Sequence, residues 1–406
     1  MAHMVIIGGG LAAESAARTL REEGYDGEIT VVSDEPHSLY ERPPLSKGYL
    51  QGTEDRDAVI LHPPDWYETH RIEVRTSTAA TAVDPGARRV ALADGSALSY
   101  DALLLATGAA PRRLPIDGHD LPGVRTLRRL DDADALRAEL KDGGRRLVLI
   151  GSGWIGMEVA ATARTLGNEV TVLEREAVPL AAAVGARMGE VFRRLHLDHG
   201  VDLRTSTHVE RIVGAERVTG VVADGETVPA DLVLVGVGAV PNTGLAEAAG
   251  LEVDNGVLTD AALRTSAPGV FAAGDVANAI HPVIGHRLRS EHWDNALRSG
   301  PVAARGMLGI PALHDGIPYF YTDQYDLGME LSGYPPLMRA AELVVRGDLD
   351  AREFIAFWVD GGRVVGGMNV NVWDVNETVQ RLIRAGGEVD AEALADPGTP
   401  LESLVP

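Results

Sequence analysis

The 406 residues of the chain include no cysteine. Disulfide bonds, thiolate metal sites, iron–sulfur ligation and thiol–disulfide catalysis all depend on cysteine sulfur. The chain can supply none of these, and no other pattern in it indicates a metal site. Any redox chemistry in this protein must therefore use a bound cofactor.

Basic residues are also few. Lys and Arg number 37 against 59 Asp and Glu, which gives a formal net charge of −22. Nucleic acids and anionic membrane surfaces select basic patches. We therefore expect neither as a partner. An acidic protein partner stays open, because docking follows local patches of charge and not the total.

Long apolar runs are missing as well. No segment approaches the roughly 20 apolar residues that span a bilayer. The first apolar strand begins at about Met4, which leaves no room for a signal peptide, so we expect a cytoplasmic protein. Hydrophobic residues make up 45% and charged residues 24%, as in ordinary globular proteins. The length predicts two or three domains.

A strand–turn–helix–strand pattern occurs twice. Each copy has an apolar strand, a glycine-rich turn, a helix of about four turns and a second apolar strand, which together make a βαβ unit. The first copy covers residues 5–32, with the turn Gly8-Gly9-Gly10-Leu11-Ala12-Ala13. The second covers residues 147–173, with the turn Gly151-Ser152-Gly153-Trp154-Ile155-Gly156.

Each copy ends in an acidic residue, at the spacing of about 20 residues that a dinucleotide-binding fingerprint requires. The acid is Asp34, with Glu35 beside it, in the first copy and Glu174 in the second. The first two glycines allow a tight turn and close approach to a pyrophosphate, while the third small residue lets the helix pack on the strand. The helix N-terminus offers N–H groups to the phosphates, and the acid accepts from ribose hydroxyls. Two copies predict two bound dinucleotides.

Other strands also end in small residues. Residues 103–108 end in Ala106-Thr107-Gly108, and residues 232–238 end in Gly238. Such runs are typical of buried parallel strands, and the small residues let the chain turn beside a cofactor. Residues 89–92 and 218–222 alternate like antiparallel insertions. From about Pro318 aromatic residues increase, and we predict an α+β domain with its last helix near residues 377–384, followed by a polar tail.

These motifs resemble those of the FAD-dependent, NADH-using ferredoxin reductases of bacterial cytochrome P450 and Rieske oxygenase systems (putidaredoxin reductase-like). The resemblance also rests on Glu41-Arg42-Pro43-Pro44-Leu45-Ser46-Lys47, Val240-Pro241-Asn242, Val270-Phe271-Ala272-Ala273-Gly274-Asp275 and Pro318-Tyr319-Phe320-Tyr321-Thr322-Asp323-Gln324-Tyr325. It covers nearly the whole chain.

The resemblance implies an α/β fold of the glutathione-reductase type. Two Rossmann-type domains are followed by a C-terminal α+β domain. The FAD-binding domain would comprise residues 1–111 and 242–316, and the NADH-binding domain residues 112–241. The C-terminal domain would comprise residues 317–406.

The same resemblance implies which residues bind FAD. Asp34 or Glu35 would accept from the adenosine ribose, and Asp275 from a ribityl hydroxyl. Lys47 would lie near the flavin N5, where an ammonium stabilises negative charge, and Trp293 would lie against the ring at the start of a helix aimed at the pyrimidine edge. The remaining FAD-binding residues would be Gly8, Gly10, Ala12, Ala13, Arg42, Ala80, Ala106, Thr107, Gly108, Arg128 and Gly274.

The NADH residues follow in the second copy. Glu158 would face the nicotinamide, and with Lys47 and Trp293 it completes the predicted catalytic set. Glu174 would bind the 2′-hydroxyl and repel a 2′-phosphate, although Arg175 beside it could soften that repulsion. The other residues expected to bind NADH are Gly151, Gly153, Ile155, Gly156 and Gly238.

The resemblance also implies a ferredoxin, of the 2Fe-2S type, as the electron acceptor of a monomer or weak homodimer. The surface of this chain on which the ferredoxin would dock is the patch of Arg287, Arg289, Arg298 and Arg305, near Trp293. One departure is Ser299-Gly300-Pro301, which replaces a more charged run found in some members.

The leading hypothesis is an enzyme in which NADH gives a hydride to FAD and single electrons pass to a small iron–sulfur protein. Flavin suits this exchange because it accepts two electrons together and releases them singly. Disulfide reductases and NADH oxidases of this fold need a cysteine in the region of residues 38–47, and there is none. Two alternatives stay open. One is a reductase of rubredoxin, quinone or ascorbate radical, and the other is a redox-sensing interaction protein resembling apoptosis-inducing factor.

Overall fold

The computed structural model describes residues 2–405, and the chain forms two compact units. The first unit comprises Met1–Arg42, Arg56–Ala110 and Ala239–Pro318. The second comprises Pro43–Asp55, Pro111–Gly238 and Tyr319–Pro406. None of the helices within residues 2–405 is long and apolar enough to cross a membrane. The three-domain division stays a prediction.

The first unit is built on a parallel five-stranded sheet of order β19-β7-β1-β2-β3. Apolar residues on both sides of β1 and β7 explain its burial: Ile6 and Leu104 face one core, and Val5 and Leu103 face the other. A strand buried on both faces needs such a continuous apolar run. The strands are β1 (His3–Ile7), β2 (Glu28–Val32), β3 (Ile72–Arg75), β7 (Ala102–Leu105) and β19 (Val270–Ala272).

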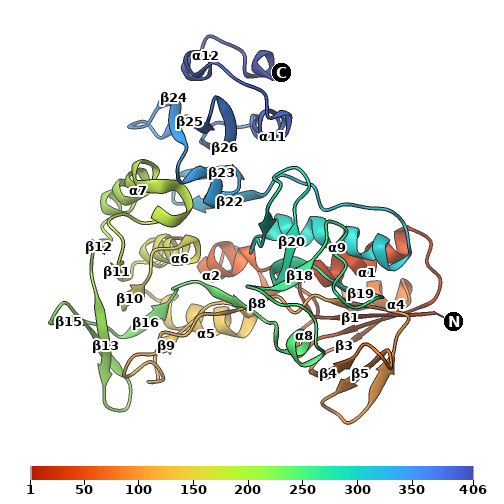
Figure 1. The fold of residues 1–406 in the computed structure, drawn as a ribbon. Helices are drawn as coiled ribbons and strands as arrows, with labels where there is room; N and C mark the ends of the chain where they lie inside the picture. Colours follow the sequence, from red (N-terminus) through yellow and green to blue (C-terminus); the bar gives the residue numbers. More distant parts are fainter. Residues whose placement is uncertain (1, 406) are drawn as a thin grey trace. The chain divides into compact units, whose positions relative to one another are not determined.

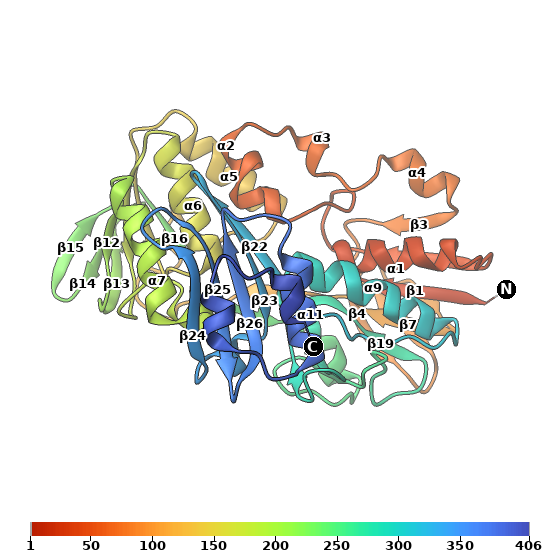
Figure 2. The same cartoon turned by 90° about the horizontal axis from the view of Figure 1, so that it is seen from above.

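Two helices, α1 (Leu11–Glu22) and α9 (Trp293–Met307), pack side by side in this unit (Figures 1 and 2). Gly300 makes the close packing possible, because a Cβ there would stand 2.5 Å from the Ala12 carbonyl oxygen. The small Ser299-Gly300 step, a departure from the resemblance, therefore has a structural cause.

Smaller elements complete the first unit. An antiparallel sheet joins β4 (Ala80–Asp84), β5 (Arg89–Leu92) and β6 (Ala97–Ser99), which confirms the predicted insertion. A second small sheet joins β18 (Val257–Thr259), β20 (Ala277–Ile280) and β21 (Arg287–Leu288), and β17 (Ala239–Pro241) pairs with β8 (Ala109–Pro111). The short helices are α3 (Arg56–Val59), α4 (Pro64–Thr69), α8 (Gly244–Ala248) and η2 (Gly274–Val276).

The second unit repeats the parallel design in a sheet of order β12-β11-β10-β16-β9. Its strands are β9 (Val124–Arg125), β10 (Arg146–Ile150), β11 (Glu169–Leu173), β12 (Asp202–Arg204) and β16 (Leu232–Val235). The helices are α5 (Leu130–Leu140), α6 (Trp154–Thr165) and α7 (Ala181–Asp198), with η1 (Pro43–Ser46) and α2 (Gly48–Gln51). The predicted second antiparallel insertion is confirmed as β13 (Val209–Gly214), β14 (Val218–Ala223) and β15 (Glu226–Pro229).

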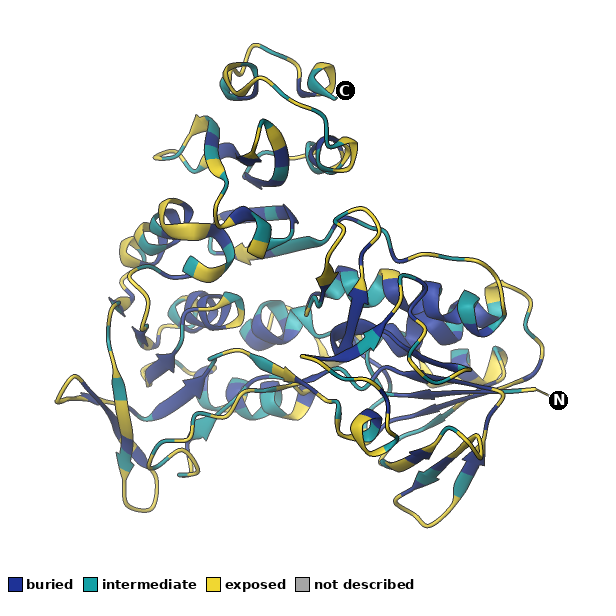
Figure 3. Cartoon of the chain, in the orientation of Figure 1, coloured by how far each residue is buried: buried dark blue, intermediate teal, exposed yellow. Residues whose placement is uncertain are grey.

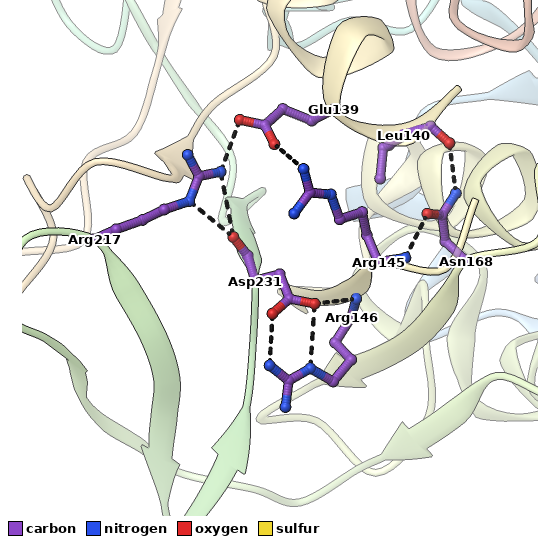
Figure 4. A network of polar contacts seen from close by, with 7 residues as sticks. All are labelled: Glu139, Leu140, Arg145, Arg146, Asn168, Arg217 and Asp231. Atoms are coloured by element: carbon purple, nitrogen blue, oxygen red, sulfur yellow. Dashed lines mark hydrogen bonds and ion pairs between the residues drawn. The ribbon is translucent and has the colours of Figure 1, made fainter. Parts of the chain in front are cut away.

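A polar network ties this sheet to its neighbours (Figure 4). Asp231, just before β16, accepts from both the backbone and the guanidinium of Arg146, and these bonds hold its pKa below the usual range. Glu139 of α5 pairs with Arg217 at 2.7 Å and with Arg145 at 3.6 Å. Such partly exposed pairs contribute about 1 kcal/mol or less each, so the network adds only modestly to the stability of the unit.

The C-terminal segment forms an antiparallel sheet of order β22-β23-β26-β25-β24, in which the three inner strands are mostly buried and the two edge strands are more exposed (Figure 3). The strands are β22 (Tyr319–Gln324), β23 (Leu327–Gly333), β24 (Glu342–Asp348), β25 (Glu353–Asp360) and β26 (Arg363–Val370), and the helices are α10 (Pro335–Met338) and α11 (Asn376–Ala385). The predicted polar tail is wrong. Two further helical turns follow, α12 (Ala391–Ala395) and η3 (Leu401–Leu404), because Leu394 and Leu401 are buried in the core of this sheet.

Candidate functional site

The first glycine turn joins β1 to α1 in the geometry that a pyrophosphate requires. Gly8 has φ +133°, and a Cβ there would lie 2.0 Å from the Ala106 carbonyl oxygen, so only glycine fits. Gly10 is the N-cap of α1 and has no side chain to accept from the first turn of the helix. A Cβ at Gly10 would meet nothing within 4 Å. The first N–H groups of a helix need an outside acceptor, so this open end fits a phosphate.

Residues near the start of α1 complete this end of the first unit. Gly274, in the turn of η2, has φ +72°, and a Cβ there would lie 3.0 Å from the Ala12 Cβ. Its N–H donates to Ser299 Oγ at 2.9 Å. The close approach of Gly274 to Ala12 places the adjacent, buried Asp275 near the N-terminus of α1, as expected for a residue that binds the ribityl chain.

The end of β2 differs from the sequence-based expectation in its register. Gly8 N donates to Val32 O and Gly151 N donates to Leu173 O, so Ser33, one residue before Asp34, occupies the place that Glu174 has in the second copy. Asp34 is exposed one residue further on.

Glu35 is buried and engaged within the protein. Its carboxylate accepts from the Tyr40 hydroxyl at 2.5 Å and pairs with Arg42 at 3.0 Å. Glu35 thus holds Arg42, and which of Asp34 and Glu35 would accept from the ribose stays a prediction.

The turn after β7 is held by an asparagine from a distant part of the first unit. Asn242 Nδ2 donates to Thr107 O at 2.8 Å, and Thr107 Oγ1 donates to Asn242 O at 2.8 Å. Gly108 has φ +66° in this turn. Ala80 is the first residue of β4 and is partly buried. The structure thus gives Val240-Pro241-Asn242 a physical role, as a clamp on the turn that ends β7.

The second glycine turn, in the second unit, repeats the design of the first. Gly151 has φ +97°, and a Cβ there would lie 2.5 Å from Gly236 O. Gly153 is the N-cap of α6 without a side-chain cap, and a Cβ there would have its nearest neighbour at 4.0 Å. A Cβ at Gly156 would lie 2.7 Å from Gly151 O, so this position also needs glycine. Ile155 is 46% exposed beside it.

Glu174 is fixed beside this turn. Its carboxylate accepts from the Ser152 N–H at 2.7 Å, the Ser152 hydroxyl at 2.5 Å and the Glu176 N–H at 2.8 Å. Arg175 pairs with Glu176 at 3.3 Å and its side chain is 85% exposed. Glu174, which is expected to bind the ribose, is therefore held in place before any ligand binds, whereas Arg175 is not.

Glu158 on α6 lies in a buried cluster within the second unit. Its Oε1 is 2.8 Å from Lys47 Nζ and accepts from Thr322 Oγ1 at 2.7 Å, and its Oε2 accepts from Ser46 Oγ at 2.5 Å. The side chains of Glu158 and Lys47 are only 5% and 19% exposed. A buried carboxylate is stable only when paired and hydrogen-bonded, and this one has both. Lys47 Nζ also lies 5.3 Å above the Tyr321 ring.

Trp293 begins α9 in the first unit and is partly buried. The preceding His292 is the N-cap, and its Nδ1 accepts from the Asp294 N–H at 3.3 Å. Burial raises the pKa of Asp294, which pairs with Arg298 at 2.7 Å. Arg128, in contrast, lies in the second unit just before α5, where its N–H donates to Asp132.

Sequence reasoning missed Ser33, Ser46 and Thr322. Ser46 stands next to Lys47 in the motif that carries the resemblance, so its proximity to a residue predicted to be catalytic was a usable signal. Thr322 lies in residues 318–325, which also carry the resemblance, but its contact with Glu158 could not be foreseen because only the fold brings β22 to α6. Within residues 2–405 no group of histidine and carboxylate side chains is arranged to hold a metal ion.

Comparison with known proteins decides the family. Residues 2–300 match the family model described as pyridine nucleotide-disulphide oxidoreductase, and residues 319–405 match one described as reductase C-terminal. The chain belongs to the pyridine nucleotide-disulphide oxidoreductase family. Despite that name, this oxidoreductase has no cysteine and performs no disulfide chemistry of its own.

Relatives of this oxidoreductase extend over its whole length. The ferredoxin–NAD(+) reductase component of the anthranilate 1,2-dioxygenase system of Burkholderia cepacia is 38% identical and covers 99% of the chain and 98% of that protein. Putidaredoxin reductase of Pseudomonas putida is 36% identical, over 99% and 96%. The crystal structure of the covalent putidaredoxin reductase–putidaredoxin complex matches with a TM-score of 0.95 and 35% identity, over 100% of the chain and 98% of that chain.

These findings confirm the expected resemblance, the glutathione-reductase type of fold, and FAD and NADH as cofactors. Bound FAD supplies the redox chemistry, since it takes two electrons from NADH and releases them one at a time. Both glycine turns fit a dinucleotide by their open helix N-termini. The oxidoreductase therefore uses NADH through a flavin and not through a thiol.

Proposed function

We propose that this enzyme binds FAD at the turn of Gly8 and Gly10, binds NADH at the turn of Gly151 and Gly153, and reduces a ferredoxin. The two open glycine caps, one in each unit, carry the proposal. The names of the relatives favour a ferredoxin over rubredoxin, quinone or ascorbate radical as acceptor, and an enzyme over a redox sensor. We further propose that the ferredoxin has a 2Fe-2S cluster and serves a P450 or Rieske oxygenase.

The Lys47–Glu158 pair supports the assignment of these two residues to the hydride step. The ammonium provides positive charge where the electron density of the flavin rises on reduction, and the carboxylate keeps that ammonium in place at 2.8 Å. Neither residue has to move a proton for this role. Trp293 would orient the ring, which is the role that the resemblance implies for it.

Coenzyme choice tests the role of Glu174. Glu174→Ala removes the carboxylate that would bind the ribose hydroxyl and repel a phosphate, so the preference for NADH over NADPH should fall. The expected shift in the ratio of kcat/KM values is about ten- to a hundredfold, for a hydrogen bond to a charged group. Glu169→Ala, at the exposed start of β11 and at the other end of the strand from Glu174, is the matched control and should leave the ratio unchanged.

A wild-type enzyme that already prefers NADPH would show that Glu174 does not select the coenzyme. An alanine variant with the wild-type ratio would show the same.

The four arginines of the expected docking patch are less free than the sequence suggested. Arg287 donates to two carbonyl oxygens, and Arg289, with 12% of its side chain exposed, pairs with Glu291. Arg298 and Arg305 are 44% and 43% exposed, but each pairs with a carboxylate, Asp294 and Glu23 respectively. Arg287 is exposed as well, so any steering of an acidic ferredoxin rests on Arg287, Arg298 and Arg305 rather than on Arg289.

Salt and charge reversal test this steering. Exposed charges are screened within about 10 Å at 0.1 M salt, so reduction of putidaredoxin by NADH should slow as salt rises, while ferricyanide reduction stays nearly constant. At low salt, Arg298→Glu and Arg305→Glu should each slow putidaredoxin reduction by about three- to tenfold, as expected for charges that steer association. Flavin reduction should not change.

Arg264→Glu changes the net charge equally at a 64% exposed side chain of the same unit, and it serves as the control. If it slows putidaredoxin reduction as much as the other reversals, or if those have no effect, the arginines do not form the docking patch.

A further inference from the structure

Glu158 is held by three donors from two separate segments of the second unit. Ser46 ends η1 and Lys47 follows it, and Thr322 comes from β22 of the C-terminal sheet. Thr322 is completely buried. The nearest polar group on the next inward-facing position of β22 is Gln324, whose Nε2 donates to Thr322 Oγ1 at 3.2 Å.

The side chains of Glu158, Thr322, Gln324 and His196 form a series of hydrogen bonds in which each donor is fixed. An ionised carboxylate can only accept, so the single hydroxyl hydrogen of Thr322 must point to Glu158. The Thr322 oxygen can then only accept, which orients the amide of Gln324 with its nitrogen toward Thr322. The amide oxygen of Gln324 accepts from His196 Nε2 at 2.8 Å.

His196 is the last residue of this hydrogen-bond series, and its imidazole ring is neutral. It is completely buried on α7, and burial lowers its pKa to about 4. The Nε2–H tautomer leaves Nδ1 as an acceptor, and within the described residues Nδ1 has no hydrogen-bond partner. The uncharged side chains of Gln324 and His196 therefore orient Thr322, so that its hydroxyl donates to Glu158.

We infer that Thr322 is a positioning residue for the transfer of the hydride from NADH, because its hydroxyl holds the Glu158 carboxylate in the orientation that also keeps Lys47 in place. The inference rests on the proposed role of Glu158. Without the Thr322 hydroxyl, Glu158 Oε1 keeps only the flexible ammonium of Lys47 as a partner. The carboxylate can then rotate while its Oε2 keeps the hydrogen bond to Ser46. The C-terminal sheet thus contributes a side chain to the hydride step.

Rapid mixing of the holoenzyme with NADH under anaerobic conditions tests the inference. Thr322→Val should slow flavin reduction about tenfold, the smaller end of what a lost hydrogen bond to a charged group produces. The dissociation constant of NADH should stay within about twofold of the wild-type value, because the contacts of the pyrophosphate and ribose are not touched. Thr322→Ser keeps the hydroxyl and should restore the rate.

Thr378→Val is the matched control. Thr378 is a buried threonine of the same sheet domain, with a long 3.5 Å contact to Glu402, far along the chain from Glu158. Its valine variant removes a buried hydroxyl elsewhere in the same domain and should keep the wild-type rate. If the Thr322 valine variant does not fold, Thr322→Ala provides the same loss of the hydroxyl.

Glu158→Gln distinguishes a failure of the proposed role of Glu158 from a failure of the positioning role of Thr322. If it reduces flavin at the wild-type rate, the proposed role of Glu158 fails. If it is slow while the folded Thr322→Val or Thr322→Ala variant is as fast as wild type, or if Thr322→Ser is as slow as the valine variant, the inference about Thr322 alone is overturned.

Discussion

Replacing Gly10 with alanine is expected to give a folded chain that binds FAD about a hundredfold more weakly. The backbone of Gly10 has φ −99° and ψ −176°, which any residue adopts, and its Cβ would meet no protein atom within 4 Å. The fold should therefore tolerate the methyl group. The pyrophosphate should not, because it must approach the backbone at this point. An overpacked contact of about 1–3 kcal/mol corresponds to a loss of about five- to 150-fold in affinity.

The measurement is a titration of the apoprotein with FAD, together with its thermal unfolding. The unfolding of the variant apoprotein should match that of the wild-type apoprotein. Gly8→Ala makes a contrast, because its Cβ would stand 2.0 Å from the Ala106 oxygen in a backbone with φ +133°. That variant should fail to fold, whereas Gly10→Ala should fail only to bind.

The matched control is Gly153→Ala in the second copy, where the nearest atom to a new Cβ is Gly236 O at 4.0 Å. It should purify with FAD and lose about a hundredfold in affinity for NADH, by the same argument. Dithionite should still reduce its flavin. If Gly10→Ala keeps its FAD, or if Gly153→Ala loses FAD and keeps NADH, the assignment of the two turns is wrong.

The repeated features of the fold were open to prediction from the sequence because they are local. Each glycine turn lies between an apolar strand and a helix, and the alternating residues 89–92 and 218–222 did form antiparallel strands. The C-terminal tail was not predictable in this way. Leu394 and Leu401 lie in short apolar groups of a mostly polar stretch, and nothing in their spacing shows that the C-terminal sheet buries them.

The candidate site shows the same division. The partners of Glu174 lie in its own βαβ unit, so the fingerprint spacing was enough to find the residue. The choice between Asp34 and Glu35 depends on where β2 ends, which is set by the hydrogen bond from Gly8 to Val32 and cannot be counted from the sequence. Thr322 meets Glu158 only through the tertiary fold, so no spacing could have revealed it.

The measurement that tests the central account most directly is an anaerobic titration of the purified wild-type protein with NADH, followed through the flavin absorbance. We predict a yellow protein with one FAD per chain, whose absorbance is bleached by one equivalent of NADH. No thiolate-to-flavin charge-transfer band should develop, because the chain has no cysteine. Oxidised putidaredoxin or ferricyanide should then restore the colour. A colourless protein that cannot be reconstituted with FAD, or a bound flavin that NADH does not bleach, would contradict the account.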